Sequence, residues 1–106
     1  MDLNQLKDKA ADFSDRKFGY RRNAAKLIHK LKEEVEELYE DLQEGKDPSL
    51  EFADCFLIII DAYRMYFGND VDMQKLIDDS SKKLDICETR EWGKPDEHGN
   101  FKHIVK

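Results

Sequence analysis

Two pairs of acidic residues, each with the same short spacing, are the side chains of this sequence best suited to chemistry. The first pair is Glu34 and Glu37, the second is Glu51 and Asp54, and the members of each pair are three positions apart. Asp61 follows Asp54 by seven positions, so a helix would carry both on one face. Grouped carboxylates of this kind are typical ligands of a hard divalent cation.

The first acidic pair borders an apolar stripe. At about 100° per residue, Glu34 lies beside Leu27 and Leu31, and Glu37 follows one turn later, whereas Glu33 turns further outward. A run of acidic residues is often only a solvated helix face. Carboxylates at the edge of a core, however, need a compensating positive charge. The two acidic segments offer few cations, so we expect a bound divalent ion to supply that charge.

The ligand types narrow the choice of metal. Sites made only of carboxylate oxygens suit Mg²⁺ or Mn²⁺, and Mg²⁺ binds through carboxylates together with substrate phosphates. Di-iron bundles use a Glu followed three residues later by His, and neither acidic segment has this pattern. His98 and His103 lack a partner at ligand spacing, so zinc is not expected. We therefore expect Mg²⁺, with Mn²⁺ as the alternative.

Helical periodicity supplies the elements that would position these carboxylates. Apolar residues recur every three to four positions along most of the chain, which predicts an all-α fold. Gly19, Gly45 and residues 68–70 interrupt the pattern. Asp47 and Pro48 predict the start of the third helix, as N-cap and first helical residue. The expected four-helix bundle has a short helix before Gly19, helices over residues 20–43, 48–67 and 72–91, and a non-helical tail over 93–106 that forms a short hairpin or an extended arm.

The third helix predicts an oligomer. Residues 55–60 are apolar on nearly every side, and one domain of 106 residues can hardly bury such a helix alone. We therefore expect a homodimer or a dimer of dimers. In the first helix, Phe13 and Phe18 are expected to be core residues rather than a base-binding site. The residues of the fourth helix expected to face inward are Met73, Leu76, Ile77, Leu84 and Cys87.

Composition limits the class of protein. The length predicts a single domain over residues 1–106, and the net charge of −6 argues against non-specific nucleic-acid binding. The longest apolar run is too short to span a bilayer, and the first residues lack the pattern of a secretory signal. Cys55 and Cys87 have neither metal-ligand spacing nor the pattern of a disulfide scaffold. We expect a cytoplasmic protein with free thiols and without a membrane or nucleic-acid partner.

The acidic segments resemble those of a known superfamily. Residues 30–38, followed by residues 51–54, resemble the MazG-like all-α NTP pyrophosphatases, whose signature is Glu-Glu-x-x-Glu, a spacer and Glu-x-x-Asp. Residues 54–62, 83–84 and 90–92 extend the likeness to the dATP/dGTP pyrophosphohydrolase-like subgroup, over most of the chain. The resemblance implies hydrolysis of a nucleoside triphosphate between its α- and β-phosphates, which yields the monophosphate and pyrophosphate.

The resemblance also implies roles for individual residues. Lys83 and Arg90, seven positions apart on one expected helix face, match the basic positions that meet the phosphates. Alternatively, Lys83 and Arg90 are only a pair of exposed residues on the helix surface. Trp92 would either stack on a base or close the core. Cys87 stands where the family commonly has Asn, which leaves base preference open. The family pattern assigns Mg²⁺ coordination to Glu34, Glu37, Glu51 and Asp54. Glu33 matches the first Glu of the motif and would be an outer-shell or general-base residue, and Asp61, on the same helix face as Asp54, would hold a metal-bound water.

Two further hypotheses compete with a hydrolase. The chain would be a non-catalytic protein-interaction module if its acidic pairs only solubilise a helical surface. It would be a nucleotide-binding module without turnover if an essential group has been lost, and Cys87 is the one hint of this. The position of Glu34, Glu51 and Asp54 at the border of the expected core favours the enzyme, because solubilising charges avoid that border.

Overall fold

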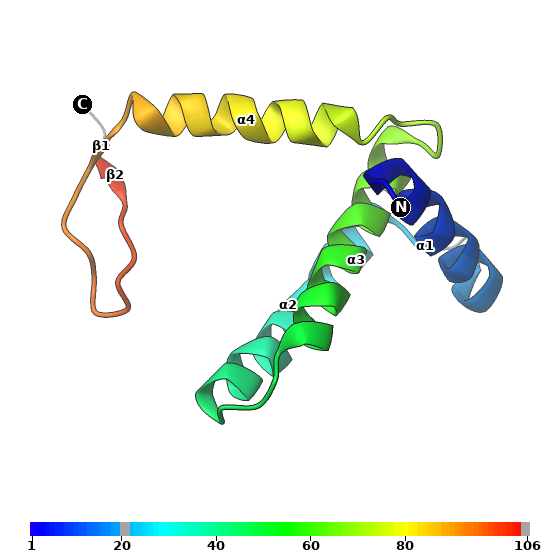
Figure 1. The fold of residues 1–106 in the computed structure, drawn as a ribbon, viewed down its shortest axis with the longest axis horizontal. Coiled ribbons are helices and arrows are strands. Elements are labelled where there is room, and N and C mark those ends of the chain that lie inside the picture. Colours follow the sequence, from blue (N-terminus) through cyan, green and yellow to red (C-terminus); the bar gives the residue numbers. More distant parts are fainter. Residues whose placement is uncertain (20–21, 105–106) are drawn as a thin grey trace. The chain divides into compact units, whose positions relative to one another are not determined.

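The computed structural model describes residues 1–19 and 22–104, in two compact units, Met1–Met73 and Gln74–Lys106. The described residues contain four helices and one pair of short strands, which confirms the predicted all-α class with a short non-helical tail (Figure 1). The first unit contains α1 (Leu3–Phe18), α2 (Ala24–Gln43) and α3 (Ser49–Phe67), and the second contains α4 (Gln74–Glu88), β1 (Glu91–Trp92) and β2 (His103–Ile104).

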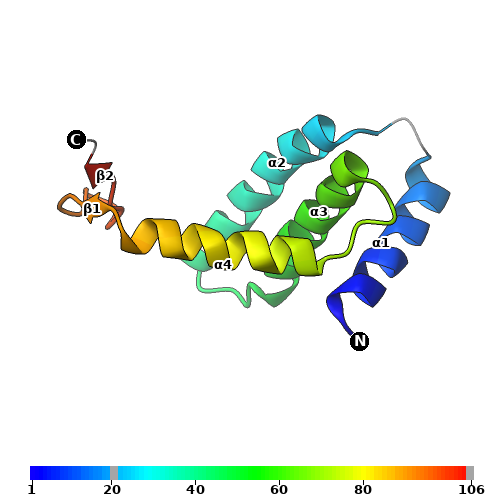
Figure 2. The same ribbon diagram turned by 90° about the horizontal axis from the view of Figure 1, so that it is seen from above.

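Helices α2 and α3 form an antiparallel pair, and α1 packs against α3 (Figures 1 and 2). The largest fully buried side chains among the described residues are Leu27 of α2, Ile60 of α3 and Met73, which directly precedes α4. Phe56, Leu57 and Ile59 in the centre of α3 are exposed. The chain therefore covers only part of its most apolar helix. None of the described helices is long and apolar enough to cross a bilayer.

The starts of α2 and α3 differ from the predicted ones by a few residues. Helix α2 begins at Ala24, because the side chain of Asn23 caps it by accepting a hydrogen bond from the backbone N–H of Lys26 at 2.9 Å. The predicted residues Tyr20 and Arg21 lie outside the described part of the chain. Helix α3 begins at Ser49 rather than at the predicted proline. The carboxylate of Asp47 accepts from the backbone N–H and the hydroxyl of Ser49.

Polar contacts fasten α1 to the segment that follows α3. The buried ammonium group of Lys7 donates to the backbone carbonyls of Asn69, at 3.0 Å, and Val71. The side chain of Asn4 accepts from the backbone N–H of Met73 at 2.8 Å. These bonds satisfy backbone groups that lie outside any helix. They therefore set where α1 lies along the end of α3.

The second unit is one helix and a hairpin. The predicted fourth helix is too long at both ends, because α4 runs only from Gln74 to Glu88. Beyond its end, the backbone N–H of Arg90 donates to the carbonyl of Cys87 in a turn. The tail then forms the antiparallel pair β1–β2, so the hairpin alternative for the tail is the observed one. Ile77 and Leu84 were expected to face inward but are exposed. Two strands of two residues each offer too little apolar surface to cover them.

Candidate active site

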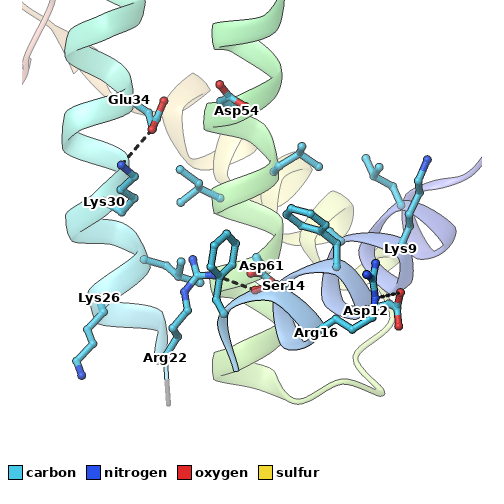
Figure 3. A pocket seen from close by; sticks show the side chains of 17 residues that line it. Lys9, Asp12, Ser14, Arg16, Arg22, Lys26, Lys30, Glu34, Asp54 and Asp61 are labelled. Atoms are coloured by element: carbon cyan, nitrogen blue, oxygen red, sulfur yellow. Dashed lines mark hydrogen bonds and ion pairs between the residues drawn. The ribbon is translucent and has the colours of Figure 1, made fainter. Parts of the chain in front are cut away.

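A cleft of about 920 Å³ lies between α1, α2 and α3 (Figure 3). Its volume falls within the range of small-molecule sites, and its lining combines a mostly apolar surface with nine charged side chains. Three of the predicted site residues line it, namely Glu34 from α2 and Asp54 and Asp61 from α3. The antiparallel packing of α2 on α3 brings these side chains together from two segments about twenty positions apart in the chain.

The four predicted metal ligands gather in one region of the first unit. Glu34 and Asp54 lie on facing helices at the same end of the cleft (Figure 3). The pKa of the Glu37 carboxyl is raised, first by the negative charge of Glu34 and also by that of Glu51. Burial raises the pKa of the Cys55 thiol, and the negative charges of all four carboxylates raise it further. Cys55 therefore lies at the centre of a strongly negative region.

The side chains in this region do not form a closed coordination shell. Among residues 1–19 and 22–104, no three His, Cys, Asp or Glu side chains are grouped closely enough to hold a metal ion as they stand. The chemistry of the donors nevertheless fits a hard cation, because every candidate ligand is a carboxylate. Their mutual repulsion, visible in the raised pKa of Glu37, is relieved when a divalent ion binds among them. Coordination of an ion by these carboxylates would therefore require their side chains to rotate.

Asp61 lies deep in the cleft and is already paired. Its carboxylate is buried and accepts a hydrogen bond from Nε of Arg64 at 2.6 Å. The same guanidinium reaches Asp15 of α1 at 3.0 Å and the side chain of Asn69 at 3.1 Å. The expectation that these helices offer few cations to pair with the carboxylates is therefore wrong for Asp61, and also for Glu34, which lies 3.4 Å from Nζ of Lys30. Arg64 was not among the predicted site residues, although its position one helical turn after Asp61 is a signal for such a pair.

Glu33 lies outside the cleft and acts on it through a neighbour. Its carboxylate is exposed and binds Nζ of Lys30 at 3.0 Å, and the same ammonium lies 3.4 Å from the carboxylate of Glu34. The hydrogen bond to Glu33, and then that to Glu34, raises the pKa of Lys30. Lys30 itself lines the cleft. One lysine thus links the first Glu of the predicted signature to the second.

The aromatic side chains of α1 line the cleft instead of joining the core. Phe13 and Phe18 are 49% and 60% exposed, which corrects the expectation that they are core residues. The reason is that the buried face of α1 carries Lys7 and Ser14. The two phenylalanines therefore lie on another face of the helix, which borders the cleft. Their rings meet edge to face at 5.8 Å. The guanidinium of Arg22 lies 4.9 Å from the ring centre of Phe18 and donates to the hydroxyl of Ser14 at 2.9 Å.

The three predicted substrate contacts lie in the second unit. Arg90 lies beyond the end of α4, so the prediction that Lys83 and Arg90 share one helix face is wrong. Arg90 and Trp92 line a hollow of about 230 Å³ beside the end of α4. The indole N–H of Trp92 donates to the carbonyl of Cys87 at 3.1 Å, which ties the hairpin to the helix. Lys83 is exposed on α4 and does not line this hollow.

Comparison with known proteins identifies the family. The family model described as dATP/dGTP pyrophosphohydrolase matches residues 6–106, nearly the whole chain. The chain belongs to the dATP/dGTP pyrophosphohydrolase family. This membership confirms the resemblance of the acidic segments and places the chain among the hydrolases that act on nucleoside triphosphates. No curated protein sequence matches the chain.

A solved structure shares the family fold. The chain is similar to the structure of the cyanophage S-2L MazG-like pyrophosphohydrolase bound to dGDP and three catalytic Mn²⁺ ions per active site. The TM-score is 0.76 and the sequence identity is 26%, with 100% of this chain and 96% of the phage chain covered. The helical arrangement of this dATP/dGTP pyrophosphohydrolase family member is therefore that of a MazG-like enzyme.

Proposed function

We propose that this chain hydrolyses deoxynucleoside triphosphates between the α- and β-phosphates in a Mg²⁺-dependent reaction, with Mn²⁺ as a substitute. The products are a nucleoside monophosphate and pyrophosphate. The observation that carries the proposal is that Glu34 and Asp54 face one another across the end of a cleft, with Glu37 and Glu51 beside them. The family description makes dATP and dGTP the first substrates to test. The dGDP and Mn²⁺ ions of the phage enzyme support the substrate class and a divalent metal.

The carboxylates have distinct proposed roles. Glu34, Glu37, Glu51 and Asp54 would hold the divalent ions. A bound ion would neutralise the triphosphate and orient a water molecule for in-line attack on the α-phosphorus. Glu33, which lies outside the cleft and is paired with Lys30, is proposed to act as an outer-shell residue or as the general base.

Asp61 has a positioning role in this proposal. One oxygen of its carboxylate accepts from Arg64, and a carboxylate has further acceptor capacity, which Asp61 can offer to the cleft that it lines. We propose that it holds a water molecule of the metal shell. Its buried ion pair with Arg64 fixes the direction of the carboxylate.

Aromatic and basic side chains would bind the base and the phosphates of the nucleotide. The side of the cleft formed by α1 presents Phe13 and Phe18, and aromatic rings of this kind stack well on nucleobases. Lys83 and Arg90 are proposed phosphate contacts, and Trp92 a contact to the base. The exposed apolar residues of α3 support a homodimer or a dimer of dimers. The two free cysteines support a reducing, cytoplasmic location.

The test is pyrophosphate release from a panel of ribo- and deoxynucleoside triphosphates, with Mg²⁺, with Mn²⁺ and with EDTA. Wild type is compared with Glu37→Gln and with the matched control Glu36→Gln, an exposed residue of the same helix. We expect metal-dependent turnover that falls by at least a hundredfold in Glu37→Gln and is unchanged in Glu36→Gln. A protein that binds dGTP without releasing pyrophosphate would instead be a nucleotide-binding module. A protein that binds no nucleotide would be a protein-interaction module.

A further inference from the structure

A regular row of charged side chains leads along one wall of the cleft to the carboxylates. Arg22, Lys26, Lys30 and Glu34 are spaced four positions apart, and all four line the cleft (Figure 3). Lys26, Lys30 and Glu34 belong to α2, where positions four apart lie on one face and about 6 Å apart along the axis, whereas Arg22 stands just before the helix. The row therefore contains three positive groups in succession and ends at a predicted metal ligand.

The three cations of the row differ in their surroundings. Arg22 is half-buried and held in place by the hydroxyl of Ser14 and the ring of Phe18. Lys26 is exposed in the first turns of α2 and lines the cleft. Lys30 is exposed and bound to carboxylates of its own helix. Arg22 thus forms a fixed end of the row, while the two lysines keep flexible stems that can follow a ligand.

We propose that Lys26 and Lys30 bind the β- and γ-phosphates of the substrate, the part that leaves as pyrophosphate. This inference rests on the proposed function and adds a substrate contact to it. A triphosphate approaching four carboxylates is repelled unless positive charge compensates it, and the row supplies that charge on the approach to the carboxylates. The backbone positions of the two lysines are about 6 Å apart along α2, which is close enough for both ammonium groups to reach one diphosphate through their four-carbon stems.

Lys30 changes partners in this proposal. In the structure its ammonium lies 3.4 Å from Glu34, so it supplies positive charge to a predicted metal ligand. A divalent ion held by Glu34 would supply that charge instead, and Lys30 would then turn to the phosphates. Lys30 therefore competes with the metal in the absence of nucleotide and assists binding when nucleotide is present. These two effects have opposite signs and can be measured separately.

The kinetic test uses Lys26→Met, Lys30→Met and the double variant, with Lys32→Met as the matched control. Lys32 is exposed on the same helix but does not line the cleft. We expect KM for dGTP to rise about tenfold per substitution, in line with the loss of one charged hydrogen bond. Inhibition by inorganic pyrophosphate should weaken in parallel, whereas inhibition by dGMP should change less than twofold. Equal weakening for dGMP and pyrophosphate would overturn the assignment.

A binding test reports on the partner exchange without turnover. Titration of Mn²⁺ into nucleotide-free protein by calorimetry should show tighter binding to Lys30→Met than to wild type, by severalfold at low salt. Lys32→Met should bind Mn²⁺ as wild type does, and an equal or weaker affinity of Lys30→Met would contradict the exchange. Wild type that releases no pyrophosphate would refute the proposed function. If wild type is active but the Lys26 and Lys30 variants have the same KM and the same inhibition by pyrophosphate as Lys32→Met, only the present inference is refuted.

Discussion

Nε of Arg64 lies 2.6 Å from Oδ1 of Asp61, and both side chains are more than nine-tenths buried. The same guanidinium continues to Asp15 of α1. One cation thus joins α1 to α3 behind the cleft and neutralises a carboxylate that lines it. The pair links the stability of the helical unit to the shape of the proposed site.

Replacing Arg64 by Met should destabilise the fold by about 3–5 kcal/mol, because Asp61 is left buried without its partner. Arg64→Lys should cost less, since it restores charge but not the forked geometry. The free energy of unfolding from urea titration measures both. Arg16→Met, which breaks an exposed pair with Asp12, is the control and should change stability by less than about 1 kcal/mol. Equal effects at positions 64 and 16 would contradict the structural role.

Replacing Lys7 by Met should destabilise the fold by about 1–3 kcal/mol, because two backbone carbonyls lose their donor. Amide hydrogen exchange should quicken at Val71 and Met73, where the chain leaves α3. Urea titration and exchange monitored by NMR test the two effects together. Lys17→Met, at an exposed position of the same helix, is the control and should show neither effect. Faster exchange throughout the protein would argue against a local fastening.

The thiol of Cys55 should react slowly with disulfide reagents in the folded, metal-free protein. Burial raises its pKa, and so do the negative charges of Glu34 and its neighbours. A raised pKa means a smaller thiolate fraction at any given pH. The reaction rate therefore rises with pH only at higher pH values. We expect Cys87→Ser, which retains only Cys55, to show this displacement relative to the same protein unfolded in urea. Identical pH profiles for folded and unfolded protein would rule it out.

A charge in the exposed stripe of α3 should block the predicted self-association. Phe52, Phe56 and Ile59 follow helical spacing and are 54%, 45% and 40% exposed. We expect the wild-type mass from light scattering to be that of a dimer or tetramer and Phe56→Lys to be a monomer. Leu50→Lys, on another side of α3, is the matched control. A monomeric wild type at micromolar concentration would contradict the prediction.

The sequence predicted what depends on local periodicity and missed what depends on how helices meet. The helical class and the convergence of Glu34 with Asp54 follow from spacing on two adjacent helices. The cleft position of Phe13 depends on which face of α1 packs on α3, and that face is chosen by the buried contacts of Lys7 and by Arg64. The true end of α4 depends on pairing of β1 with the distant β2. Periodicity within α4 has no information on that pairing.

Because α2 is an unbroken helix, the spacing between its charged residues is as important for their placement in the cleft as the residue types themselves. Lys26, Lys30 and Glu34 share one face only because no residue is inserted or removed between them. Deleting a single residue between Lys30 and Glu34 would turn the two parts of the helix by about 100° relative to each other. Every charged side chain would survive, yet the lysines would point away from the carboxylates. This stretch should therefore tolerate many replacements but no change of length.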